Sequence, residues 1–189
     1  MFTTFSASAS GDWRVTWQRT LRGAPLGKTP YLSVARRPYF FASAVAAPDN
    51  RWQLIGVPSN ARYVQKDEKA QLVRVQAGLG RSEATCAALI PIRKSEAWWN
   101  LSQDERREIF EAKSRHIADC LKYLPAIARQ LYHARDLGQP FDFLTWFEFA
   151  PEHSAQFDAL VAQLRETEEW SFVEREVDIR LSAVTDAAE

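Results

Sequence analysis

The chain has 189 residues, with 24 Lys and Arg side chains against 24 Asp and Glu, so its formal net charge is zero. A neutral chain has no general attraction for nucleic acid, and a hydrophobic content of 46% argues against disorder. The apolar runs are far shorter than the roughly 20 residues that span a bilayer. With no recognisable signal peptide, the sequence predicts one compact cytoplasmic unit that binds neither nucleic acid nor membrane.

The first part of the chain is irregular. Prolines at positions 25, 30, 38, 48 and 58 separate short segments with strand-like patterns. These segments include residues 13–17, 39–43 and 52–54, and one helix is expected around residues 67–77.

The second part has a clear order of elements. An apolar strand is expected at residues 86–92, and Ser102 with Glu105 forms a capping-box pattern that opens a helix to about residue 121. Two strands, a helix with one apolar face and a final strand follow at 126–133, 142–149, 152–167 and 171–181.

This order is that of a ferredoxin-like unit. We predict an α+β fold of the dimeric α/β-barrel type, with an antiparallel sheet and helices on one face. Residues 81–189 would form a C-terminal ferredoxin-like subdomain and residues 1–80 a truncated N-terminal copy.

One histidine falls on an apolar helical stripe. Ile109, Ala112, His116 and Cys120 recur at spacings of three and four residues, so His116 is expected to face inward. An inward histidine is most often a core residue satisfied by one hydrogen bond. The alternatives are a general base or a single axial ligand to a haem.

One arginine falls on the apolar side of a predicted strand. Arg129 alternates with Ile127 and Leu131, where an unpaired charge is costly. Either a carboxylate pairs with Arg129, or its guanidinium faces a cavity that receives small anions.

Several segments together resemble the chlorite dismutase family, and in particular its short, dimeric lineage. They are ALIPIRKSEAWWNLSQDERREIFEAKSRH, LKYLPAIARQLYH and FDFLTWFEF, supported upstream by SNARYV and VQAGLGRSEAT. The resemblance implies a homodimeric haem b enzyme that converts chlorite into chloride and dioxygen. In that reaction a ferryl haem would form and Arg129 would hold the hypochlorite fragment. Another small anion is the alternative substrate.

The resemblance also implies roles on the proximal side of the haem. His116 would be the iron ligand, and Glu169 would accept a hydrogen bond from it. Glu166 and Glu168 lie close enough in sequence to be alternatives to Glu169. Lys94 would join the same network.

On the distal side, the resemblance assigns catalytic roles to Arg129, as a flexible arginine, and to Gln76. Tyr63, Trp98 and Ile90 would contact the haem, the first two near its propionates.

The same residues also fit other functions. A coproheme decarboxylase of the same superfamily would use a tyrosine near the propionates, and Tyr63 is available. A peroxidase-like enzyme, a haem carrier or sensor, and a cofactor-free barrel with a buried His116 are the further alternatives.

Overall fold

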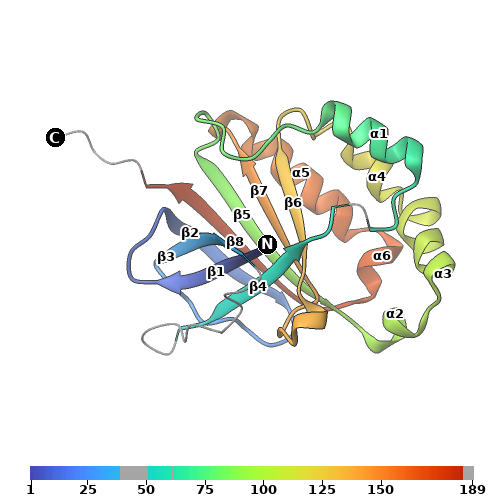
Figure 1. The fold of residues 1–189 in the computed structure, drawn as a ribbon, viewed down its shortest axis with the longest axis horizontal. Helices are drawn as coiled ribbons and strands as arrows, with labels where there is room; N and C mark the ends of the chain where they lie inside the picture. The colour runs from blue at the N-terminus through green and yellow to red at the C-terminus, as the bar shows by residue number, and fades with distance from the viewer. Residues whose placement is uncertain (39–50, 61, 185–189) are drawn as a thin grey trace.

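The computed structural model describes residues 1–38, 51–60 and 62–184. In this part of the chain, strands close into an antiparallel barrel in the order β1-β3-β2-β8-β5-β7-β6-β4 (Figure 1). Closure pairs every strand on both sides, which removes the exposed edges that an open sheet presents. The strands are β1 Phe2–Ser8, β2 Trp13–Arg22, β3 Tyr31–Arg37, β4 Gln53–Pro58, β5 Cys86–Lys94, β6 Ala128–His133, β7 Phe143–Phe149 and β8 Val173–Ala183.

Helices gather on one side of the barrel, next to β5, β6 and β7, whereas β1, β2 and β3 lie on the other side (Figure 1). None of the described helices is long and apolar enough to span a bilayer. The helical segments are α1 Lys66–Val75, α2 Glu96–Asn100, α3 Gln103–Arg107, a π-helix at Glu108–Lys113, α4 His116–Cys120, 3₁₀ turns at Arg135–Leu137 and Pro151–His153, α5 Ser154–Arg165 and α6 Glu168–Ser171.

The barrel wall separates two cores. Along β8, Val177, Ile179 and Leu181 belong to the core inside the barrel, because alternate residues of a strand point to the same side. On the opposite side of the strand, Glu176 and Asp178 are buried too, and they bond to Arg165 of α5 outside the barrel. The second core, which includes side chains of β5, β7 and α5, fills the space between the barrel wall and α5.

The α+β class and the antiparallel sheet are confirmed. Strands β5 to β8 and helices α1 and α5 lie at the predicted places, with ends that differ by one to a few residues. Strands β1 and β3 were not predicted, and the expected strand at 39–43 lies outside the described residues. Residues 1–80 contribute β1 to β4 and residues 81–189 contribute β5 to β8, while the division into two ferredoxin-like subdomains stays a prediction.

The prediction of one continuous helix at residues 102–121 is wrong. The chain forms α3, a π-helical turn and α4, with a break at Ser114 and Arg115. The amide of Ser114 donates to the carbonyl of Ile109, five residues back, and this wider turn shifts the residues that follow. Ala112, within this turn, is exposed, although the regular stripe placed it inward. Arg106 of α3 is buried.

Candidate active site

A large pocket lies between the outer face of β5, β6 and β7 and the helices α4, α5 and α6, with about 1000 Å³ of empty space that includes its opening to solvent. Its walls are mostly apolar, which is typical of sites for organic ligands. Every site residue predicted from the sequence except Gln76 lines this pocket: Tyr63, Ile90, Lys94, Trp98, His116, Arg129 and Glu169.

The break in the helical segment determines where His116 lies. Arg115 adopts a left-handed conformation with φ of 50°, and His116 is the first residue of α4. The carboxylate of Glu111 caps α4 by accepting from the amides of Ile117, at 2.6 Å, and Ala118, at 3.1 Å. A non-glycine residue with positive φ stores strain that the surrounding contacts must offset, and such residues concentrate at functional sites.

His116 bonds to a buried carboxylate. Its Nδ1 atom lies 2.7 Å from Oε2 of Glu169, and Oε1 of Glu169 lies 2.9 Å from Nζ of Lys94. Burial raises the pKa of Glu169, but the charge of Lys94, the charge of His116 and the hydrogen bonds from both lower it further, to about 2. An ionised Glu169 accepts the proton on Nδ1, which leaves Nε2 of His116 as the atom that can bind a metal.

The helix that carries Glu169 distinguishes it from its neighbours. In α6, the amide of Glu169 donates to Oγ of Ser114 at 3.0 Å, which fixes this turn beside His116. Glu168 instead lies 3.4 Å from Lys113 in a half-exposed ion pair. Of the three neighbouring glutamates considered from the sequence, Glu169 is therefore the one that reaches His116.

Arg129 extends from β6 to the pocket wall, as the alternation along the strand predicts. Its Nε atom is buried without a hydrogen-bond partner, and no carboxylate among the described residues forms an ion pair with it. Burial lowers the pKa of the guanidinium, and the nearby Cys120 offsets part of this effect. Of the two alternatives left open by the sequence, the structure favours a cavity that receives an anion over a paired carboxylate.

Comparison with known proteins identifies the family. The model of the family described as chlorite dismutase matches residues 28–184, most of the chain. The chain belongs to the chlorite dismutase family. A chlorite dismutase from Ideonella dechloratans is 32% identical over 102 residues; this match covers 50% of the chain and 33% of that protein, about a third of its length.

Two solved structures show how far the similarity to other chlorite dismutases extends. A dimeric chlorite dismutase from Nitrobacter winogradskyi is 58% identical, with a TM-score of 0.88, over 96% of this chain and 99% of that one. A variant chlorite dismutase from Candidatus Nitrospira defluvii in complex with cyanide is 19% identical, with a TM-score of 0.67, over 97% of this chain and 90% of that one. The second comparison supports the fold alone.

Gln76 does not line the pocket, although its resemblance to a chlorite dismutase residue predicted a catalytic role on the distal side of the haem. It follows the last residue of α1, and its Nε2 atom donates to the backbone carbonyl of Arg129 at 2.8 Å. Its side chain therefore holds the strand that carries Arg129, and it lies outside the pocket lining. Its catalytic role stays a prediction.

Two aromatic residues that line the pocket have polar atoms without hydrogen-bond partners. The hydroxyl of Tyr63 and Nε1 of Trp98 are buried without hydrogen-bond partners, and their rings meet edge to face with centroids 6.1 Å apart. Tyr63 has a φ of 61°, and Arg107 donates to its carbonyl. Buried donors without partners are costly, so these two groups suit a bound ligand with acceptor oxygens.

Among the pocket residues that the sequence did not predict, two lie beside predicted ones. The ring of Phe110 stacks on His116 with centroids 4.4 Å apart. The two are six residues apart, which in an unbroken helix puts them on different faces, so the π-helical turn and the break at Arg115 together bring them into contact. The other is Trp170, next to Glu169 in α6. Its position directly after Glu169, a candidate partner of His116, was the signal in the sequence that could have predicted a place in the pocket.

Proposed function

We propose that the protein binds haem b in this pocket and converts chlorite into chloride and dioxygen, as a chlorite O2-lyase. One observation carries the proposal: a histidine bonded to a buried, ionised glutamate shares an apolar pocket with an arginine whose buried Nε atom has no hydrogen-bond partner. Family membership supports the same conclusion.

The residues of the pocket fit a haem. Nε2 of His116 would bind the iron, and Ile90 lies on a wall that would contact the porphyrin. Tyr63 and Trp98, the donors without partners, would bond to the propionates. When bound, the haem supplies an iron that can take up and return an oxygen atom.

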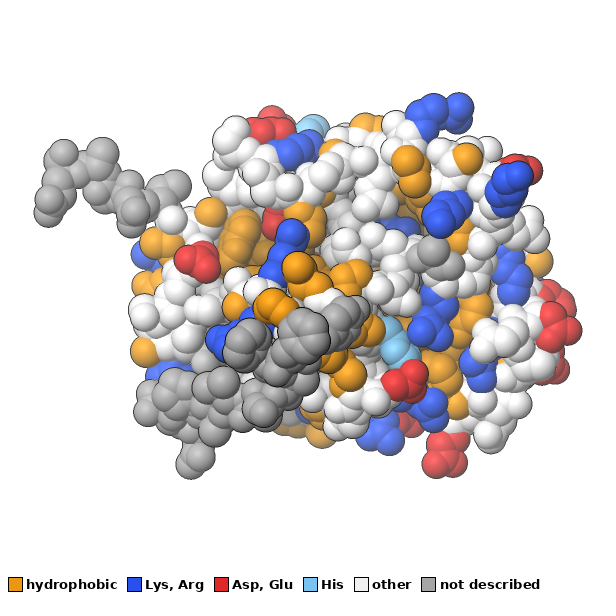
Figure 2. Space-filling view, in the orientation of Figure 1, with side chains coloured by type: hydrophobic (Ala, Val, Ile, Leu, Met, Phe, Trp, Pro, Cys, Tyr) orange, Lys and Arg blue, Asp and Glu red, His pale blue; other side chains and the backbone are white. Residues whose placement is uncertain are grey.

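The protein contributes charge and position to this chemistry. Anionic Glu169 makes the imidazole of His116 a stronger electron donor, and Lys94 keeps that carboxylate ionised. The guanidinium of Arg129 attracts the chlorite anion and then holds the hypochlorite fragment beside the reaction centre until the oxygen–oxygen bond forms. On the helical side of the face in Figure 2, Lys and Arg side chains are interspersed with Asp and Glu side chains, as expected of a chain with a net charge of zero.

Oxygen release on an electrode, after chlorite is added to haem-loaded protein, tests the proposal. We expect rapid oxygen evolution from the wild-type protein. The variant His116→Ala should lose both the haem and the activity, whereas His133→Ala, at a buried histidine outside the pocket lining, should retain the haem. No Soret band after haemin addition would overturn the haem assignment. A normal Soret band without oxygen release would instead favour a haem sensor or coproheme chemistry.

We also propose that the protein is a homodimer. The relative from Nitrobacter winogradskyi is described as dimeric and matches nearly the whole of both chains. Light scattering coupled to size-exclusion chromatography should give twice the mass of the 21.6 kDa chain. A monomer mass at micromolar concentration would contradict this assembly.

A further inference from the structure

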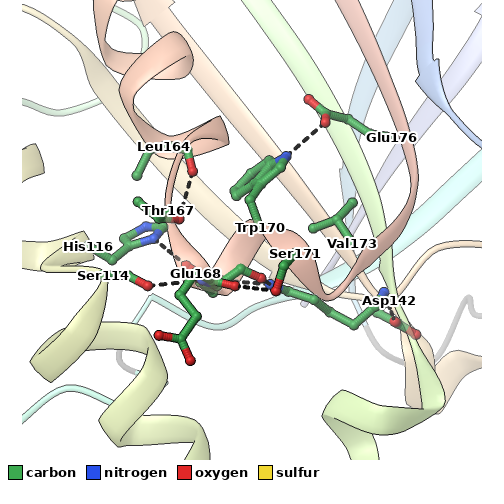
Figure 3. A network of polar contacts seen from close by, with 12 residues as sticks. Ser114, His116, Asp142, Leu164, Thr167, Glu168, Trp170, Ser171, Val173 and Glu176 are labelled. Atoms are coloured by element: carbon green, nitrogen blue, oxygen red, sulfur yellow. Dashed lines mark hydrogen bonds and ion pairs between the residues drawn. The ribbon is translucent and has the colours of Figure 1, made fainter.

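A second buried carboxylate holds a side chain of the pocket. The indole Nε1 of Trp170 donates to Oε2 of Glu176 at 2.8 Å (Figure 3). Trp170 is 7% exposed and Glu176 only 1% exposed. The mechanism above uses neither residue, yet a nearly inaccessible carboxylate is costly to bury.

Glu176 is itself fixed from the opposite side. Its Oε1 atom accepts from Nε of Arg165 in α5 at 2.7 Å. Both carboxylate oxygens of Glu176 therefore have a donor, one from each of two helices. Arg165 also donates to the neighbouring buried Asp178, at 2.8 Å.

Trp170 in turn contacts the network behind His116. The ammonium of Lys94 lies over the ring of Trp98, at 4.5 Å from its centroid, and 5.7 Å from the centroid of Trp170. Lys94 is the residue that pairs with Glu169. The orientation of the Trp170 ring therefore limits where the ammonium, and with it the carboxylate of Glu169, can lie.

The backbone couples the two sites directly. Helix α6 is a single turn of four residues, Glu168–Ser171, so Glu169 and Trp170 are adjacent and cannot reorient independently. Arg22 of β2 donates to the carbonyl of Trp170 at 2.8 Å and further fixes this turn.

We propose that Glu176 is a positioning residue for His116, which acts by holding the indole of Trp170 and, through it, Lys94 and Glu169. Buried ion pairs add little stability over apolar groups of the same shape, so orientation is the property that this pair supplies here. The inference rests on the proposed binding of haem at His116. Loss of the Glu176–Trp170 bond would weaken the hydrogen bond between Glu169 and His116, and a weaker donor at the iron raises its reduction potential.

The test compares haem-loaded Glu176→Gln with Asp178→Asn. The two variants remove the same charge at neighbouring buried positions, and Arg165 contacts both residues, but only Glu176 bonds to Trp170. A glutamine has one acceptor oxygen where Glu176 uses two, so it cannot serve both Arg165 and Trp170. The readouts are the Fe(III)/Fe(II) reduction potential and the iron–histidine stretching frequency. We expect Glu176→Gln to raise the potential and lower the frequency, and Asp178→Asn to change both much less.

Trp170→Phe provides an independent variant, because it removes the indole donor and keeps an aromatic face toward Lys94. It should shift both readouts in the same direction as Glu176→Gln, and the double variant should shift them no further. Equal shifts in Glu176→Gln and Asp178→Asn would indicate a simple charge effect and overturn the inference. Unchanged readouts in Trp170→Phe would overturn it too, even if Glu176→Gln did not fold.

The same measurements separate this inference from the proposed function. A wild-type protein that binds haem but releases no oxygen would refute the chlorite reaction, while the potentials and frequencies would still test the role of Glu176. A wild-type protein that binds no haem would refute both.

Discussion

Nδ1 of His116 lies 2.7 Å from Oε2 of Glu169, although 53 positions separate the two residues in the chain. The first is at the start of α4 and the second is in α6, and each helix is a short turn held by its own anchors. Their contact fixes which ring nitrogen of His116 faces the pocket.

The contact between Glu169 and His116 should control haem affinity. We expect Glu169→Gln to bind haem about 10 to 100 times more weakly, the range usual when the partner of a metal-binding histidine is changed, because glutamine is uncharged and has one acceptor oxygen where Glu169 uses two. Glu168→Gln is the matched control, since this neighbouring side chain pairs with Lys113 at the surface. Titration with haemin, followed by the Soret band, measures both. Equal affinities in the two variants would show that Glu169 does not act through His116.

Glu169 should also make stability depend on pH. Its pKa is about 2 in the folded protein against an ordinary 4.5, so the unfolded chain binds the proton more readily. The stabilisation from this group is complete above pH 4.5 and is lost as the pH falls toward 2. Urea unfolding of the haem-free protein at several pH values in this window should show a smaller loss of stability in Glu169→Gln than in the wild type. Parallel curves would contradict the lowered pKa.

Arg129 should govern both turnover and the survival of the enzyme. We expect Arg129→Ala to lower the rate of oxygen release by roughly 100-fold, as the loss of a charged donor at a reaction centre often does. Hypochlorite should then escape and bleach the haem after fewer turnovers. Arg129→Lys keeps the charge but loses the planar fork, so its behaviour should be intermediate. The same number of turnovers before bleaching in all three proteins would rule out a holding role.

The two cysteines should differ in reactivity. Cys120 is 4% exposed, and burial raises the pKa of its thiol to about 12. Cys86 is partly exposed, and burial raises its thiol pKa too. Because the thiolate is the reactive form, iodoacetamide at mildly alkaline pH should label Cys86 slowly and Cys120 only after unfolding. Mass spectrometry of the labelled peptides provides the measurement, and rapid labelling of native Cys120 would contradict its buried position.

The sequence by itself determined the features that depend on local periodicity and short motifs. Alternation along residues 126–133 placed Arg129 on the apolar side of its strand, and the helical spacing in residues 152–167 predicted the buried face of α5. The segments around His116, Lys94 and Trp98 carried the resemblance to the family that the comparisons confirm.

Tertiary structure alone decided which distant groups meet. A regular spacing could not reveal the π-helical turn that brings Phe110 onto His116, because that turn depends on where the chain packs. Nor could a regular spacing select Glu169 over its neighbours. A shift of one residue in a helical turn redirects a side chain by more than a quarter turn. The contacts that fix α6 come from Ser114 and Arg22, which are far away in the chain. Closure of the barrel also depended on long-range pairing of β2 with β8 and of β4 with β6, which no local pattern encodes.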